Sequence, residues 1–569
     1  MANYIAMQGR PLIECVPNFS EGRDMTIIKQ ITDEIESVEG VRLLDVDPGM
    51  ATNRTVVTFV GEPEPVIEAA YLAIKKAAEL IDMSKHKGAH PRMGATDVCP
   101  LIPIANITMD EVVEFAKKLA HKVGKSLGIP LFLYEHAATS ADRKNLATIR
   151  AGEYEGMAEK LKNSKWKPDY GPSTFNPKAG VTAIGARDFL IAYNVNLNTT
   201  SVRRANSVAF DVREKGRIKR DGHPITGEIV RDKNGDPVRE PGKCKAVKAI
   251  GWFIDEYGIA QISMNITDIN ITPLHVAFEA CRESASSRGM RVTGSELVGL
   301  VPKKVLIEAG KYFLRKQERS VGIAEREVIK IAVESLGLDH LGPFDPDKKV
   351  IEYLLEDENA HPLVDMKLSA FADLTASESP APGGGSVSAY VGALGASLGA
   401  MVANLSSHKR GWDDKWEVFS EWAEKGQQIK DRLLALVDED TRAFNAILTA
   451  IRMPKSTKEE KEARKKAMHD ATRYAIEIPF QVLETSYEIF GLAAEMVKNG
   501  NPNSISDAGV AALCARAAMH GAWMNVKINI QGFDDPKFVK DILKRSEKLC
   551  KEGDLREEEI RLAVDKSFK

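Results

Sequence analysis

The spacing of apolar residues predicts alternating strands and helices in the first part of the chain. Short apolar runs bounded by turn residues predict strands at Ile13–Phe19, Val41–Val46, Thr55–Val60, Val98–Ile104 and Leu131–Tyr134. Apolar residues that recur every three or four positions predict helices around 28–35, 66–81 and 112–119. This alternation is typical of layered folds in which helices cover one face of a sheet.

A second unit of similar make-up follows. In Phe189–Leu197, one face of the predicted strand carries Asn194 and Asn196. A helix and further strands come after it, interrupted by a basic, Gly- and Pro-rich excursion at 217–243. Two such units predict ferredoxin-like split βαβ subdomains over residues 1–188 and 189–355.

Helical periodicity dominates the remainder of the chain. Residues 356–364 are polar and predict a linker, and residues 365–569 show no strand pattern. The predicted fold is therefore an α+β N-terminal half followed by an all-α helical C-terminal domain.

Composition and charge narrow the classes of partner. A net charge of -3 gives no reason to expect a nucleic-acid partner. The six cysteines contain no CxxC pair, which is typical of a reducing cytoplasm. Residues 379–407 are uncharged and long enough to span a bilayer, but they are rich in Gly, Ala and Ser. We therefore expect a closely packed bundle helix and no membrane partner.

The densest group of reactive side chains is KHKGAHPRMGATD, Lys85–Asp97. Pro91 disfavours helical geometry at His90, so the histidine should lie on a loop, where it can act as a general acid or base. The alternative is a surface loop with incidental charges. His86 lies four residues before His90, but Pro91 argues against a continuous helix that would present both to a metal, and we predict no metal.

Two further stretches have both a structural and a functional interpretation. Asp47 ends a predicted strand and either orients His90 or serves as a turn residue in Asp-Pro-Gly. Residues 169–180 contain four Gly and Pro residues, which excludes regular structure and leaves a linker or a ligand-facing loop.

The C-terminal domain has its own candidates. PAPGGGS precedes the small-residue helix, and its backbone amides either bind an anion or form a packing turn. Asp440 falls on the predicted apolar stripe that includes Val437, Phe444 and Ile451, whereas Asp438 falls off it. A carboxylate on an apolar face is either a proton-transfer group with a raised pKa or a structural partner of a buried arginine or helix end.

Ten motifs in order carry a resemblance to a known family. ECVPNFSEG, LLDVD, NRTVVTFVG, HPRMGATDVCP, IRAGEYEG, GPSTFNP and GSELVGLVP resemble the formiminotransferase domain. APGGGSV, LVDEDTRAF and the SISD helix resemble the cyclodeaminase domain. Together they resemble the bifunctional formimidoyltransferase-cyclodeaminase family of histidine degradation, over about residues 12–550.

The resemblance implies two reactions on folate. The first half would transfer the formimino group from N-formimino-L-glutamate to tetrahydrofolate and release glutamate. The second half would cyclise 5-formiminotetrahydrofolate to 5,10-methenyltetrahydrofolate and release ammonia. The co-substrate would be polyglutamylated tetrahydrofolate, and the assembly a homo-oligomer of dimers, possibly a ring of dimers.

The resemblance also implies roles for particular residues. His90 would be the transferase acid and base, supported by Asp47 as its orienting partner and Arg92 for a substrate carboxylate. Asp440 would shuttle protons in the cyclodeaminase. The folate-contacting loop would be Gly171, Pro172, Ser173, Thr174, Phe175, Asn176, Pro177, Lys178, Ala179 and Gly180. The cyclodeaminase loop would be Pro382, Gly383, Gly384, Gly385 and Ser386.

Three alternatives stay open at this point. The helical domain could serve only for assembly or folate binding, with transfer as the sole reaction. The whole chain could be a non-enzymatic folate-binding scaffold. The helical domain could also act on methenyl-folate in the manner of a cyclohydrolase.

Overall fold

The computed structural model describes residues 11–50, 52–88, 91–222, 226–355 and 361–568. It divides into two compact units, Met1–Ala309 with Ala332–Glu356 and Gly310–Ile331 with Asp357–Lys569. His90 lies outside the described residues. Gly310–Ile331 is grouped with the second unit, whereas the sequence placed this segment in the second subdomain.

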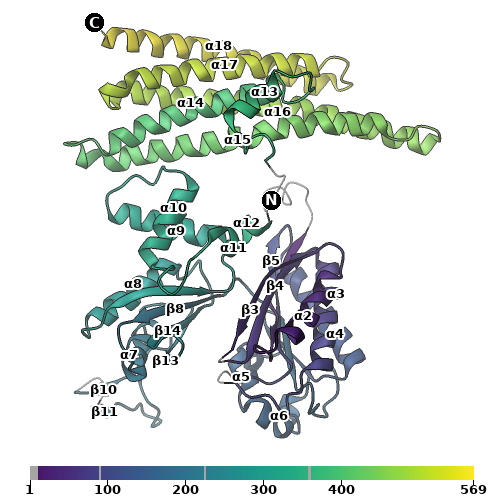
Figure 1. The fold of residues 1–569 in the computed structure, drawn as a ribbon, viewed down its shortest axis with the longest axis vertical. Helices are drawn as coiled ribbons and strands as arrows, with labels where there is room; N and C mark the ends of the chain where they lie inside the picture. The colour runs from purple at the N-terminus through teal and green to yellow at the C-terminus, as the bar shows by residue number, and fades with distance from the viewer. Residues whose placement is uncertain (1–10, 51, 89–90, 223–225, 356–360, 569) are drawn as a thin grey trace. The chain divides into compact units, whose positions relative to one another are not determined.

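The first sheet has seven strands, and α2, α3 and α4 cover one of its faces (Figure 1). Its strands are β1 (Leu12–Cys15), β2 (Asn18–Phe19), β3 (Val41–Gly49), β4 (Arg54–Gly61), β5 (Thr96–Ala105), β6 (Leu131–Glu135) and β7 (Thr182–Ala186). The helices are α2 (Met25–Glu36), α3 (Pro63–Leu80) and α4 (Met109–Leu127). β1 pairs with both β4 and β5, and β3 pairs with β4, so the core of this subdomain has the split βαβ arrangement. β7 and β6 then extend the sheet in parallel to β5.

The second sheet has four antiparallel strands in the order β13-β14-β8-β15. These strands are β8 (Ile191–Leu197), β13 (Val247–Ile254), β14 (Ile259–Ile266) and β15 (Val292–Val298), with α7 (Val202–Val212) and α8 (Leu274–Ser286) between them. A strand–helix–strand–strand–helix–strand chain with this order is again a split βαβ unit. The predicted α+β fold of the N-terminal half is confirmed.

Shorter elements connect these layers. In the first subdomain they are η1 (Ala141–Arg143), α5 (Leu146–Arg150), α6 (Glu153–Lys160) and η2 (Ser164–Trp166). The excursion carries β9 (Arg217–Ile218), β10 (Arg220–Asp221), β11 (Glu228–Ile229) and β12 (Arg239–Glu240). After the second sheet come α9 (Lys303–Lys316), α10 (Glu325–Leu336), α11 (Pro346–Lys349) and α12 (Ile351–Leu355).

The second unit is helical, and its longest helices lie side by side (Figure 1). Its elements are α13 (Leu368–Thr375), α14 (Gly384–Ser407), η3 (Asp413–Lys415), α15 (Trp416–Arg452), α16 (Lys458–Asn499), η4 (Pro502–Ser504), α17 (Ile505–Asn529) and α18 (Pro536–Ser567). The connection between α9 and α10 contacts α15, because the Val321 amide donates to Ser420 Oγ at 2.9 Å. The all-α C-terminal domain is confirmed.

Small residues let α14 pack closely in this bundle. A Cβ atom added at Gly395 would lie 2.9 Å from Cys514 Cβ on α17, closer than such atoms normally approach. α14 is long and apolar enough to cross a membrane, but 61% of its most apolar stretch is buried inside the bundle. This burial is what we expect of a packed bundle helix.

Candidate functional site

The described parts of Lys85–Asp97 are held by the turn residue Asn53 and by Arg54, the first residue of β4. The Asn53 amide donates to the Lys87 carbonyl at 3.0 Å, and Arg54 Nη1 donates to the Pro91 carbonyl at 2.9 Å. A Cβ atom at Gly88 would lie 2.1 Å from the Thr52 carbonyl oxygen, so only glycine allows this approach. The chain is thus fixed on both sides of residues 89–90.

A buried charge cluster anchors the end of this loop. Asp97 is fully buried and accepts from Arg54 Nη2 at 2.8 Å and Arg150 Nη2 at 2.5 Å. It also accepts from the Met93 amide at 2.8 Å. Burial lowers the pKa of Arg54 to about 10, with Asp97 opposing that shift, so the guanidinium is charged at neutral pH. Loss of one partner would leave an unpaired buried charge, which is strongly destabilising.

Arg92 is held by protein carboxylates and by His86. Its Nη2 lies 2.6 Å from Glu155 Oε1, and its Nη1 lies 3.1 Å from Glu153 Oε2. Burial lowers the pKa of His86, whose Nε2 donates to the Asn53 carbonyl at 2.8 Å and whose Nδ1 accepts from Arg92 Nε at 3.3 Å. A substrate carboxylate would compete with Glu155 for this guanidinium, and the substrate-binding role of Arg92 stays a prediction.

The predicted folate-contacting loop, 171–180, lies against the same segment. The Ala95 amide donates to the Ala179 carbonyl at 2.8 Å, and the Val181 amide donates to the Met93 carbonyl at 2.9 Å. Gly180 has a φ of +70°, and a Cβ atom there would lie 2.3 Å from the Met93 carbonyl oxygen. Gly171–Thr174 are exposed. The structure therefore brings an exposed loop to the flank of the residues around His90.

Asp47 lies on β3 opposite Val56 of β4 and is partly buried. It is close enough to Tyr257 of the second subdomain to contribute to the raised pKa of that hydroxyl, although burial is the larger cause. Whether Asp47 orients His90 depends on a residue outside the described ones, so that role stays a prediction.

In the helical unit, Asp440 of α15 meets the first turn of α14. Its Oδ2 accepts from the Ser386 amide at 2.9 Å and from Ser386 Oγ at 3.0 Å. A Cβ atom at Gly385 would lie 2.1 Å from Asp440 Oδ1. The anion at this helix start is thus a carboxylate of the protein itself, where free amides and the helix dipole favour negative charge.

The surroundings of Asp440 set its proton affinity. Burial raises its pKa, and the two hydrogen bonds from Ser386 oppose that rise. Such a carboxyl group is poised to accept and return protons nearer neutrality than an exposed aspartate.

The predicted stripe on α15 was partly wrong. Ile451 is 46% exposed, whereas Asp438 is only 1% exposed. Asp438 is buried because it accepts from the Leu363 amide at 2.9 Å, where the chain enters the helical unit. The segment that contains Leu363 packs over the side of α15 that carries Asp438. The spacing of residues along α15 does not reveal this contact.

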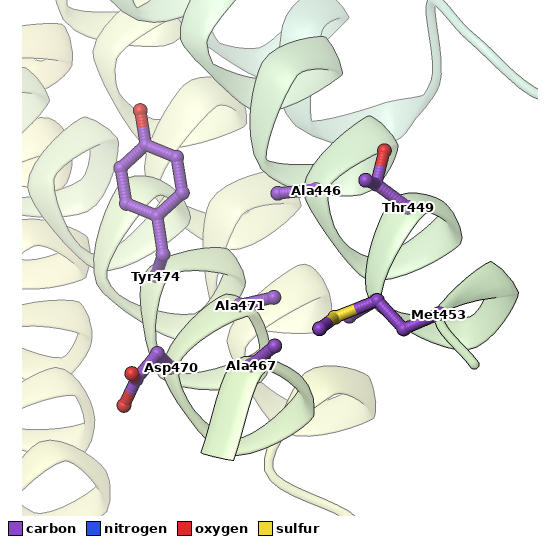
Figure 2. A pocket seen from close by; sticks show the side chains of 8 residues that line it. Ala446, Thr449, Met453, Ala467, Asp470, Ala471 and Tyr474 are labelled. Carbon is purple, nitrogen blue, oxygen red and sulfur yellow. The ribbon is translucent and has the colours of Figure 1, made fainter. Parts of the chain in front are cut away.

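A pocket of about 430 Å³ lies between α15 and α16 (Figure 2). It is lined by Ala446, Thr449, Ala450, Met453, Ala467, Asp470, Ala471 and Tyr474. Figure 2 shows Met453, the residue directly after α15, directed toward Ala467 and Ala471 of α16. Tyr474 also donates to Glu439, the residue before Asp440. The pocket therefore offers apolar surface within a few helical turns of Asp440.

Several residues that contact the Lys85–Asp97 segment were not predicted as site residues. Asn53, Arg54, Arg150, Glu153 and Glu155 all contact the Lys85–Asp97 segment. All five lie inside the motifs NRTVVTFVG and IRAGEYEG. Their place in these two motifs was the feature of the sequence that could have identified them as site residues. Within the described residues, no group of three or more His, Cys, Asp or Glu side chains is placed to hold a metal.

Comparisons with known proteins cover almost the whole chain. Family models match residues 12–187 (Formiminotransferase domain, N-terminal subdomain), 192–356 (Formiminotransferase domain) and 367–548 (Formiminotransferase-cyclodeaminase). The chain is 42% identical to the formimidoyltransferase-cyclodeaminase of Rattus norvegicus, over 95% of this chain and 96% of the relative.

Each half also has single-domain relatives. The glutamate formimidoyltransferase of Streptococcus pyogenes is 42% identical over 54% of this chain and 94% of its own length. The methenyltetrahydrofolate cyclohydrolase of Methylorubrum extorquens is 36% identical over 34% of this chain and 93% of its own length.

Proposed function

The chain belongs to the formimidoyltransferase-cyclodeaminase family, and from this premise we propose how its two halves act on folate. The protein is a glutamate formimidoyltransferase and a formimidoyltetrahydrofolate cyclodeaminase. The observation that supports this most is that the match extends through both halves, over 95% of the chain.

The transfer step needs one proton to move between two nitrogens. The folate 5-nitrogen attacks the formimino carbon, and the bond from that carbon to the glutamate nitrogen breaks. His90 is assigned as the base that takes the proton from the 5-nitrogen and as the acid that returns it to the leaving amine. The cluster of Asn53, Arg54 and Asp97 supports this assignment because it fixes the chain on either side of residues 89–90.

The cyclisation step also moves protons between nitrogens. The folate 10-nitrogen attacks the formimino carbon, and the former imino nitrogen leaves as ammonia. Asp440 is assigned to take the proton from the 10-nitrogen and to deliver a proton to the departing nitrogen. The raised pKa of this carboxyl group supports the assignment, and so does the geometry that holds it at the start of α14.

One coupled assay tests both assignments. The purified protein is given formiminoglutamate and tetrahydrofolate while glutamate, ammonia and methenyl-folate absorbance are followed. We expect His90→Ala to stop glutamate release, and Asp440→Ala to leave glutamate release intact but stop ammonia release. A full transferase rate in His90→Ala would refute the role of this histidine.

A cyclohydrolase-like activity is the second candidate for the helical unit. The similarity to the Methylorubrum extorquens protein, whose name gives this reaction, favours testing it. If the unit hydrolyses methenyl-folate, the absorbance of added methenyl-folate will fall faster with wild-type protein than with Asp440→Ala. Equal rates would argue against this activity.

We assign the homo-oligomer interface to an apolar surface on α14 and α17. On both helices the exposed apolar residues recur at helical spacing and border the seam where Gly395 meets Cys514. The surface comprises Leu394, Met401, Leu405, Val510, Leu513, Met524 and Ile528. An uncharged surface built from two antiparallel helices can pair with its own copy about a two-fold axis. We expect Leu405→Glu with Leu513→Glu to lower the mass measured by light scattering, while Leu562→Glu on α18 does not.

The remaining assignments rest on the resemblance and on chemistry. Polyglutamylated folate is proposed as the physiological co-substrate, and a glutamate-tail series in the coupled assay tests it. A cytoplasmic location is proposed because all six cysteines are free. Fractionation of cells that produce the protein tests the location.

A further inference from the structure

One face of the second sheet carries a connected set of polar side chains that the assignments above do not use. Trp252 Nε1 donates to Gln261 Oε1 at 3.1 Å, and Gln261 Nε2 donates to Asn196 Oδ1 at 2.8 Å. Asn196 Nδ2 lies 3.2 Å from His340 Nδ1. Asn196 and Gln261 are fully buried. The amide-rich face predicted for β8 is thus built into a fixed network.

This network converges on Glu296 of β15. Glu296 Oε2 accepts from Asn194 Nδ2 at 3.1 Å and from Gln261 Nε2 at 3.4 Å. Its Oε1 accepts from the Tyr257 hydroxyl at 3.4 Å. Within the described part of the chain these donors are neutral, so no cation balances the carboxylate in this network. A glutamine oxygen would satisfy the same donors at a lower desolvation cost.

The position of Glu296 relates it to the transferase site. It lies in GSELVGLVP, one of the motifs behind the family resemblance, and it is partly exposed. Burial raises the pKa of Tyr257, with Glu296 and Asp47 among the charges that raise it further, so the hydroxyl stays protonated and donates. Asp47 of the first subdomain is therefore near Tyr257, which donates to Glu296.

We propose that Glu296 is a substrate-binding residue that accepts two parallel N–H bonds from a planar N–C–N edge. This inference rests on the proposed transferase function. A carboxylate fits such an edge in a bidentate manner, as it fits a guanidinium. Two groups in the reaction have this edge: the 2-amino-4-oxo ring of tetrahydrofolate and the protonated formimino group of the other substrate.

The pterin edge is the better match. The amide groups around Glu296 are suited to the ring oxygen and nitrogens that neighbour this edge, and the formimino group has no such neighbours. The formimino carbon, in contrast, must lie where the folate 5-nitrogen and His90 meet. Glu296 then sets the orientation of the ring and selects folate over pterins without the 2-amino group.

The experiment distinguishes the two groups that could bind Glu296, the ring of tetrahydrofolate and the formimino group. Steady-state glutamate release is measured for wild type and Glu296→Gln while each substrate is varied alone, and tetrahydrofolate binding is measured by calorimetry. The matched control is Glu256→Gln, an exposed carboxylate of the turn before β14. Ammonia release from preformed 5-formiminotetrahydrofolate reports that the variant chain is folded and that its helical unit is active.

We expect Glu296→Gln to weaken tetrahydrofolate binding roughly 10- to 100-fold, the usual effect of losing hydrogen bonds to a charged group. A tetrahydrofolate without the 2-amino group should lose affinity for wild type but little more for the variant. A rise confined to the KM of formiminoglutamate would assign the edge to the formimino group instead.

Unchanged constants for both substrates, or equal effects in Glu256→Gln, would overturn the proposal. Calorimetry measures tetrahydrofolate binding without turnover. If the wild-type protein released no glutamate but still bound tetrahydrofolate through Glu296, the proposed transferase function would be refuted and the role of Glu296 would stand.

Discussion

Ser386→Ala is the sharpest test of how the helical unit prepares Asp440. The substitution removes the hydroxyl that donates to Asp440 Oδ2 at 3.0 Å and leaves the backbone amide that donates at 2.9 Å. Ser386 is fully buried, so water does not readily replace the lost donor. One of two hydrogen bonds to the carboxylate is thus lost without a change of backbone.

The size of the effect follows from the charge of the acceptor. A hydrogen bond to an ionised group contributes about 1.5–3 kcal/mol, and 1.4 kcal/mol corresponds to a factor of ten. We therefore expect ammonia release to slow roughly 10- to 100-fold while glutamate release is unchanged. Because Ser386 opposes the burial that raises the pKa of Asp440, its loss raises that pKa further. The acidic limb of the pH–rate profile should then move to higher pH.

The control is Ser388→Ala in the same helical turn. Ser388 is also buried, but its hydroxyl donates to the Gly384 carbonyl at 2.6 Å rather than to Asp440. Stopped assays of ammonia and glutamate from one reaction mixture give both rates. Equal ammonia rates in the two variants would show that Ser386 does not prepare Asp440 for proton transfer.

Three further predictions concern Gly385, Glu14 and Asp97. Gly385→Ala should abolish ammonia release, because its Cβ atom would lie 2.1 Å from Asp440 Oδ1. The control Gly491→Ala on α16 should not, since a Cβ atom there meets nothing within 4 Å, and parallel ammonia assays compare the two variants. Burial raises the pKa of Glu14 from 4.5 to about 7, so its contribution to stability is complete below pH 4.5 and lost as the pH rises through 7. The free energy of unfolding of Glu14→Gln should therefore rise by about 3 kcal/mol relative to that of wild type when the pH is raised from 4.5 to 8. Urea titrations at the two pH values measure this difference, and an unchanged difference would contradict the prediction. Asp97→Ala should destabilise the first unit by roughly 3–5 kcal/mol, because it removes the carboxylate that pairs with the buried Arg54 and the partly buried Arg150. Calorimetric scans should show its transition shifted down while the helical unit's transition stays in place.

The local content of the fold could be predicted from the chain alone. Apolar spacing identified the helix that buries Ile28, Ile31 and Ile35, since those positions share one helical face whatever surrounds them. Thr108 and Glu111 form the capping box that their spacing predicts. Such features depend on contacts within one turn, so sequence is sufficient for them.

Only part of the candidate site could be predicted from the sequence. Asp440 was identified from its place on α15, and its partner Ser386 was predicted only as a member of a glycine loop. Their contact joins residues on separate helices. Asp438 was misplaced because the segment that covers it arrives from Leu363, outside the helix whose phase was considered.

What the sequence determined by itself was the identity of the elements, the division into α+β and all-α parts, and the family, because these follow from local periodicity and ordered motifs. The tertiary structure alone decided which motifs meet. It placed Arg54 and Arg150 on one buried carboxylate, and it brought Asn194 of β8 and Gln261 of β14 to Glu296 of β15. Burial and pairing of charge depend on residues distant in the chain, and no local pattern of apolar and polar positions encodes them.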